Sequence, residues 1–116
     1  ASSASDVFSL GVVLYELATG VNPFVQSTSL GVMRAQIDLV PATLRERDAT
    51  VSPFLSEVVA TLMAKRPDAR FSSAADLRHT LLEAEASAWW HGRAALLAGI
   101  WWFVTFEQTA ITTLPR

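Results

Sequence analysis

The sequence predicts an all-α domain, and three observations support this prediction. Three stretches show helix-type apolar patterns, each bounded by residues that commonly begin or end helices. No strand-hairpin pattern and no internal repeat interrupts them. The apolar share of 51% is ordinary for a globular domain and argues against a disordered chain. With 116 residues, the chain has room for one modest domain.

The first predicted helix runs from about Asp6 to Thr19. Ser5 suits the N-cap position, Asp6 places a negative charge in the first turn, and Gly20 suits the left-handed position that ends many helices. Apolar side chains cover nearly every face of this segment, and Gly11 allows another element to approach closely. Because a helix that is apolar all round belongs at the centre of a domain, we expect neighbours on all of its sides.

The middle of the chain alternates between helical and irregular patterns. A short helix is expected near residues 29–39, and a polar, irregular stretch follows at residues 41–51. The next clear helix begins at Ser52, a capping residue followed by proline at the first helical position, and it ends by Pro67. Its expected apolar stripe consists of Leu55, Val58, Val59 and Leu62.

The last predicted helix of this region extends to about Ala86. Ser73 and Asp76 have the spacing of a capping box, which marks its beginning. Its expected inward-facing residues are Leu77, Leu81 and Leu82. The chain is therefore divided into residues 1–4, a cut end or linker, residues 5–86, a helical domain, and residues 87–116, a tail.

Charge and cysteine content exclude several classes of function. The net charge is −2 and no run of lysine or arginine occurs, so no nucleic-acid partner is expected. The chain has no cysteine, which excludes disulfides, thiolate metal ligands and a cysteine nucleophile. This composition fits a cytoplasmic domain. Residues 1–4 show neither an initiating Met nor a signal region.

The tail differs sharply in composition from the residues before it. Residues 87–116 carry only Arg93, Glu107 and Arg116 as charged residues, yet they hold all four tryptophans. Three interpretations stay open. Residues 94–114 could form a membrane-spanning helix and anchor the protein, although Glu107 would be costly in the bilayer. The tail could instead lie in the membrane interface, or pack back onto the helical domain as a hydrophobic C-terminal helix.

Two motifs in the helical domain resemble the larger lobe of eukaryotic-type serine/threonine protein kinases, in the bacterial style. The segment SDVFSLGVVLYELATG at residues 5–20, followed by Pro23 and Phe24, resembles the family's central helix. The segment LMAKRPDAR at residues 62–70 is similar to its closing L-x-K-x-P-x-x-R turn. The order of these two segments and the separation between them also match the family. The resemblance covers residues 5–86 and implies the helical second half of this lobe.

The resemblance implies roles for five residues. Asp6 would accept backbone hydrogen bonds from the catalytic loop, and Arg70 would pair with the glutamate that ends the activation segment. Val13 and Leu17 would support the hydrophobic column below the adenine, although ordinary core packing explains them equally well. Glu16 matches a position that contacts a basic substrate residue in some members, and a merely tolerated polar residue is an equal alternative.

The residues that transfer phosphate in this family are absent from the sequence. Kinase catalysis requires a glycine-rich loop, a strand lysine, a His-Arg-Asp loop and an Asp-Phe-Gly metal site, and none of these occurs here. Lys65 belongs to the closing turn, and His79 and His91 have no ligand or acid–base partner at a suitable spacing. We therefore expect no catalytic residue and no metal site in this chain, with ATP and Mg²⁺ bound elsewhere in a parent kinase.

Three functions remain open from the sequence. The first is a fragment of a serine/threonine protein kinase, whose partners would be upstream kinase segments and, for the parent, protein substrates. The second is a pseudokinase or scaffold lobe that only binds other proteins. The third is an unrelated helical interaction domain that matches the kinase pattern by chance.

Overall fold

The computed structural model describes residues 3–98, and the chain divides into two compact units, Ala1–Leu81 and Leu82–Arg116. The elements in order are α1 (Ser3–Thr19), α2 (Ser29–Asp38), α3 (Leu44–Arg47), α4 (Pro53–Leu62), η1 (Pro67–Ala69), α5 (Ala74–Glu83) and η2 (Ala84–Ala86). Residues 88–98 are also helical. Because residues 3–98 contain no strand, the predicted all-α class is confirmed.

Local capping chemistry determines most helix ends. Gly20 adopts a φ of 76° after the last turn of α1, and its amide donates to the Glu16 carbonyl at 2.7 Å. The Ser52 hydroxyl accepts from the Leu55 amide at 3.1 Å at the start of α4. Both of these ends agree with the sequence prediction. The start of α1 does not: because the helix begins at Ser3, Ser5 lies inside it and is not its N-cap.

One helix was not predicted, although its signal is present in the sequence. Residues 41–51 were expected to be irregular, but α3 forms within them. Thr43 and Glu46 make a reciprocal capping box: the Glu46 amide donates to the Thr43 hydroxyl at 3.2 Å, and the Thr43 amide donates to the Glu46 carboxylate at 3.0 Å. These two bonds satisfy amides that would otherwise lack partners at the start of such a short helix.

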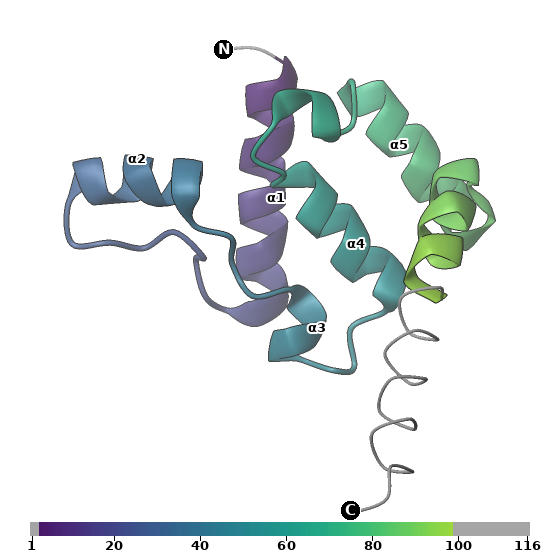
Figure 1. Cartoon of the computed structure of the whole chain (residues 1–116), viewed down its shortest axis with the longest axis horizontal. Coiled ribbons are helices and arrows are strands. Elements are labelled where there is room, and N and C mark those ends of the chain that lie inside the picture. The colour runs from purple at the N-terminus through teal and green to yellow at the C-terminus, as the bar shows by residue number, and fades with distance from the viewer. Residues whose placement is uncertain (1–2, 99–116) are drawn as a thin grey trace, which may run out of the picture. The chain divides into compact units, whose positions relative to one another are not determined.

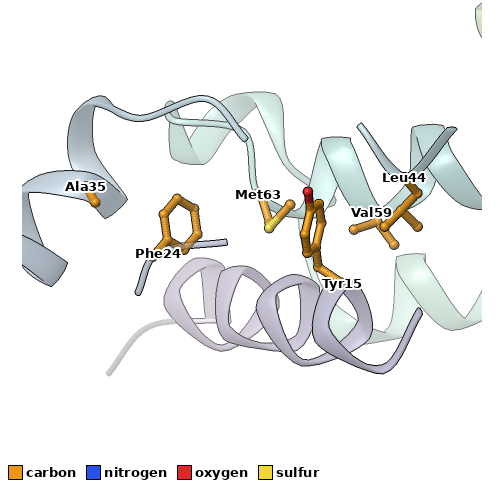
Figure 2. Close-up of a cluster of buried hydrophobic side chains, with 6 residues drawn as sticks. All are labelled: Tyr15, Phe24, Ala35, Leu44, Val59 and Met63. Carbon is orange, nitrogen blue, oxygen red and sulfur yellow. The ribbon is translucent and has the colours of Figure 1, made fainter. Parts of the chain in front are cut away.

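The core of the first unit lies between α1 and α4, which run beside each other with α3 near one end (Figure 1). Figure 2 shows side chains from several elements meeting at Tyr15 of α1. The buried cluster consists of Tyr15, Phe24, Ala35, Leu44, Val59 and Met63. The Tyr15 hydroxyl donates to the Ala42 carbonyl at 2.7 Å and accepts from Arg47 Nε at 2.5 Å. These bonds tie the segment before α3, and α3 itself, to α1.

The expectation that α1 is buried on all sides is wrong for the described residues. Leu10, Val13 and Leu17 are 39%, 53% and 77% exposed. Their spacing places them along one face of the helix. The elements that pack on α1 include α4, α3 and η1, and they leave this face uncovered. α1 therefore carries more apolar side chains than its neighbours in this unit bury.

The apolar stripes of the later helices were also partly misassigned. Val58, Val59 and Leu62 are buried as predicted, but in the first turn of α4 Phe54 is buried and Leu55 is 36% exposed. Adjacent residues differ by about 100° around a helix, so both could not face the same neighbour. In α5, Leu77 is buried, whereas Leu81 and Leu82 are exposed.

In the second unit, Ser87 precedes the helical residues 88–98 and accepts a hydrogen bond from the Trp90 amide at 3.1 Å. The rings of Trp89 and Trp90 lie 6.4 Å apart, and the Arg93 guanidinium lies 5.5 Å from the centre of the Trp89 ring. Within residues 3–98, no helix is both long enough and apolar enough to cross a membrane. Most of the tail helix predicted at residues 94–114 lies outside the described residues.

Candidate functional site

The candidate site lies at the N-terminal end of α1, where the closing turn of residues 62–70 meets it. Arg70 is the central group. Its Nη1 donates to the Ala4 carbonyl at 2.9 Å, its Nε to the Ala64 carbonyl at 2.8 Å, and its Nη2 to the Lys65 carbonyl at 3.3 Å. The guanidinium also lies 4.9 Å from the centre of the Phe8 ring. Arg70 thus joins the start of α1 to the closing turn.

An open hollow of about 430 Å³ lies beside Arg70, between α1 and α2. Its lining consists of Ser5, Phe8, Ser9, Met33, Gln36, Ile37, Lys65 and Arg70. Two of these side chains are cations and none is acidic, so the hollow has a positive character. The three bonds of Arg70 use three of its five N–H donors. The hollow is therefore suited to an anionic group from another segment.

Lys65 connects α2 to this site. Its Nζ donates to the Gln36 carbonyl at 2.8 Å and approaches the Ala35 carbonyl at 3.5 Å, near the C-terminal end of α2. It also lies 4.9 Å from the centre of the Phe24 ring. Burial lowers the pKa of Lys65 below the usual value for an amine, and this effect exceeds the opposing influence of the Asp38 carboxylate.

The structure does not bring Asp6 and Arg70 into contact. Asp6 is exposed and lines a different hollow, of about 240 Å³, with Val7, Leu10, Ala74 and Leu77. Arg66 and Asp68 form an exposed ion pair. Asp6 therefore lies near the same end of α1 as Arg70 but faces a separate opening.

The other three predicted residues lie further along α1. Val13, Leu17 and Glu16 are all exposed. Val13 and Leu17 belong to the uncovered apolar face described above, and the structure places neither beside Arg70. The described residues contain no group of three His, Cys, Asp or Glu side chains that could hold a metal ion.

Comparison with known proteins supports the resemblance seen in the two motifs. Serine/threonine-protein kinase PknB of Mycolicibacterium smegmatis is 41% identical over 78 residues, which cover 67% of this chain and 12% of the relative. PknB of Mycobacterium leprae is 37% identical over 78 residues, which also cover 67% of this chain and 12% of the relative. PknJ of Mycobacterium tuberculosis is 35% identical over 77 residues, or 65% of this chain and 13% of the relative. No protein-family model matches the chain.

The chain belongs to the bacterial-type serine/threonine protein kinases. Its helical fold agrees with the second half of the larger kinase lobe. The chain spans about an eighth of the length of these curated relatives. The sequence motif selected Arg70 as a candidate. It did not point to Lys65 as a link to α2, because the carbonyl partners of Lys65 are about 30 residues away in the chain.

The importance of Lys65 in this kinase segment can be tested by replacing it with methionine. Lys65→Met keeps the apolar stem but removes the bonds to α2 and the contact of the charge with Phe24. We expect a loss of about 1–2 kcal/mol in the free energy of unfolding, together with faster hydrogen exchange of the α2 amides.

Arg66→Met is the matched control for this change. Arg66 is 81% exposed and makes only a surface ion pair with Asp68. Its removal should change the free energy of unfolding by less than about 0.5 kcal/mol. Equal effects of the two variants on α2 exchange would contradict the assigned role of Lys65.

Proposed function

We propose that residues 5–86 form the helical base of the larger lobe of a serine/threonine protein kinase. The complete kinase would transfer the γ-phosphate of ATP to hydroxyl groups of protein substrates. The observation that carries this proposal is the positive hollow at Arg70, which has cationic side chains but no acidic residue in its lining. The kinship with PknB and PknJ and the two matching motifs support it.

In this proposal, the Arg70 hollow receives the carboxylate of the glutamate that ends the activation segment. Arg70 is already held by three backbone carbonyls, so its guanidinium is oriented before that carboxylate binds. A carboxylate can accept two hydrogen bonds from one guanidinium, which fixes both position and orientation. Asp6, at the same end of α1, would accept backbone amides of the catalytic loop through its exposed carboxylate.

This part of the kinase would position the reacting groups rather than react itself. Phosphoryl transfer depends on positioning and charge stabilisation around Mg-ATP. The residues of this chain do not fit that cofactor: the sequence has no glycine-rich phosphate loop, and the described residues offer no cluster of metal ligands. In this proposal, other segments of the complete kinase carry out phosphoryl transfer.

A chimeric kinase tests the proposal directly. Residues 5–86 would replace the matching stretch in PknB of Mycolicibacterium smegmatis, and ATP-dependent phosphorylation of a protein substrate would be measured. We expect the chimera to retain transfer within about tenfold of the parent. The rate of phosphoryl transfer should fall about a hundredfold when the same chimera carries Arg70→Met, because displaced catalytic segments misalign the reacting groups.

Two outcomes would contradict the proposal. One is a chimera that melts cooperatively but transfers no phosphate. The other is equal activity of the chimeras with and without Arg70. The 116-residue chain incubated alone with Mg-ATP and the same substrate should give no transfer above a protein-free control, and measurable transfer would show that the chain has catalytic groups of its own.

A further inference from the structure

A third hollow in the first unit has a different chemical character from the Arg70 site. It is a partly enclosed cavity of about 130 Å³ that lies between α1, residues 40–44 and α4. Tyr15, Leu44, Val59 and Met63 contribute to its wall. Figure 2 shows Tyr15 projecting from α1 between Met63 and Val59, with Leu44 close to Val59. The cavity is thus next to the buried core, and it opens to the surface beside the exposed residues Val40 and Ala60.

The polar side chains around this cavity are engaged with protein partners. The Tyr15 hydroxyl is bonded to the Ala42 carbonyl and to Arg47, and the Ser56 hydroxyl accepts from the Arg45 amide at 3.4 Å. Within residues 3–98, no buried side-chain nitrogen or oxygen lacks a hydrogen-bond partner. A water molecule is held stably in a cavity only by two or more available polar groups. The side chains of the lining therefore offer little to a water molecule and favour an apolar occupant.

The size of the cavity limits the class of ligand. An enclosed apolar protein cavity of about 150 Å³ binds a single aromatic ring, and this partly open cavity has a similar volume. Lys65 also lines this cavity, but its Nζ donates to the carbonyls near the end of α2. Its ammonium group is thus already engaged by these carbonyls, and the lining holds no second cation such as Arg70 to pair with an anionic ligand. An uncharged ring fits both the volume and the engaged polar groups.

We propose that this cavity binds a small, uncharged apolar molecule of about the size of benzene. Such a ligand would contact α1, α4 and the segment that leads into α3, and would therefore stabilise their packing. The site shares only Lys65 with the Arg70 hollow, and it does not depend on the proposed role in phosphoryl transfer.

Thermal unfolding of the 116-residue chain with benzene tests this site. We expect the Tm to rise by about 5 °C when benzene exceeds its Kd about tenfold. Benzoate at the same concentration should raise the Tm much less, because its carboxylate would lose water without gaining a donor. The NMR signals of the Leu44, Val59 and Met63 methyl groups should shift with benzene, which locates the binding site.

Cavity filling provides the second arm of the test. Ala60 lies on α4 and lines the cavity, so Ala60→Leu should reduce the benzene-induced rise in Tm by at least half. Ala75→Leu is the matched control on α5, since Ala75 is exposed and does not line the cavity. No rise in Tm with benzene, an equal rise with benzoate, or methyl shifts away from the three named residues would overturn the proposal.

Discussion

Replacing Gly11 with alanine should lower the free energy of unfolding by about 2 kcal/mol, a cost typical of overpacked sites. A Cβ at this position would lie 2.8 Å from Leu62 Cβ and 2.8 Å from Met63 Cγ. Met63 can adjust, but Leu62 Cβ is fixed to the backbone, so α1 and α4 would have to separate. This cost should exceed the gain of about 1 kcal/mol that alanine brings to a helix interior. Urea denaturation followed by circular dichroism measures the change.

Gly92→Ala is the matched control for the Gly11 substitution. Gly92 also lies in a helical segment, but a Cβ there would have no neighbour within 4 Å. The control should leave the stability unchanged or raise it, because alanine favours the helix more than glycine does. If the Gly11→Ala variant proved as stable as the Gly92→Ala variant, α1 and α4 could not approach as closely at Gly11 as described.

Replacing Arg70 with methionine should cost about 3 kcal/mol, the largest loss we expect from a single polar side chain here. Three backbone carbonyls would lose their donor, and hydrogen bonds to charged groups are among the stronger ones in proteins. The contact of the guanidinium with the Phe8 ring would also be lost. The free energy of unfolding, again from urea denaturation, is the measurement.

Two further variants make the Arg70 test specific. Arg70→Lys should lose an intermediate amount, because an ammonium group keeps the charge but cannot reach three carbonyls in the geometry of a guanidinium. Arg78→Met removes an exposed arginine of α5 and should change stability by less than about 0.5 kcal/mol. If Arg70→Met lowered the free energy of unfolding no more than Arg78→Met does, Arg70 would not connect α1 to the closing turn as described.

The candidate site was only partly predictable from the sequence. The motif around Arg70 was sufficient to select that residue, because the spacing of the closing turn is distinctive. Its carbonyl partners were not predictable. Every residue has a carbonyl, and side-chain identity does not indicate which carbonyl accepts a hydrogen bond from the guanidinium. The same limit applies to Lys65, whose partners on α2 depend on how two distant segments pack.

The sequence by itself determined the helical class and most helix ends of this protein. Caps such as Ser52 and Gly20 act within a few residues, so their effect is encoded locally. Only the tertiary structure decided which apolar side chains are covered. Leu17 and Val59 are equally apolar in the sequence, yet Leu17 is exposed and Val59 is buried. The physical reason is that burial requires a neighbour, and neighbours come from segments distant in the chain.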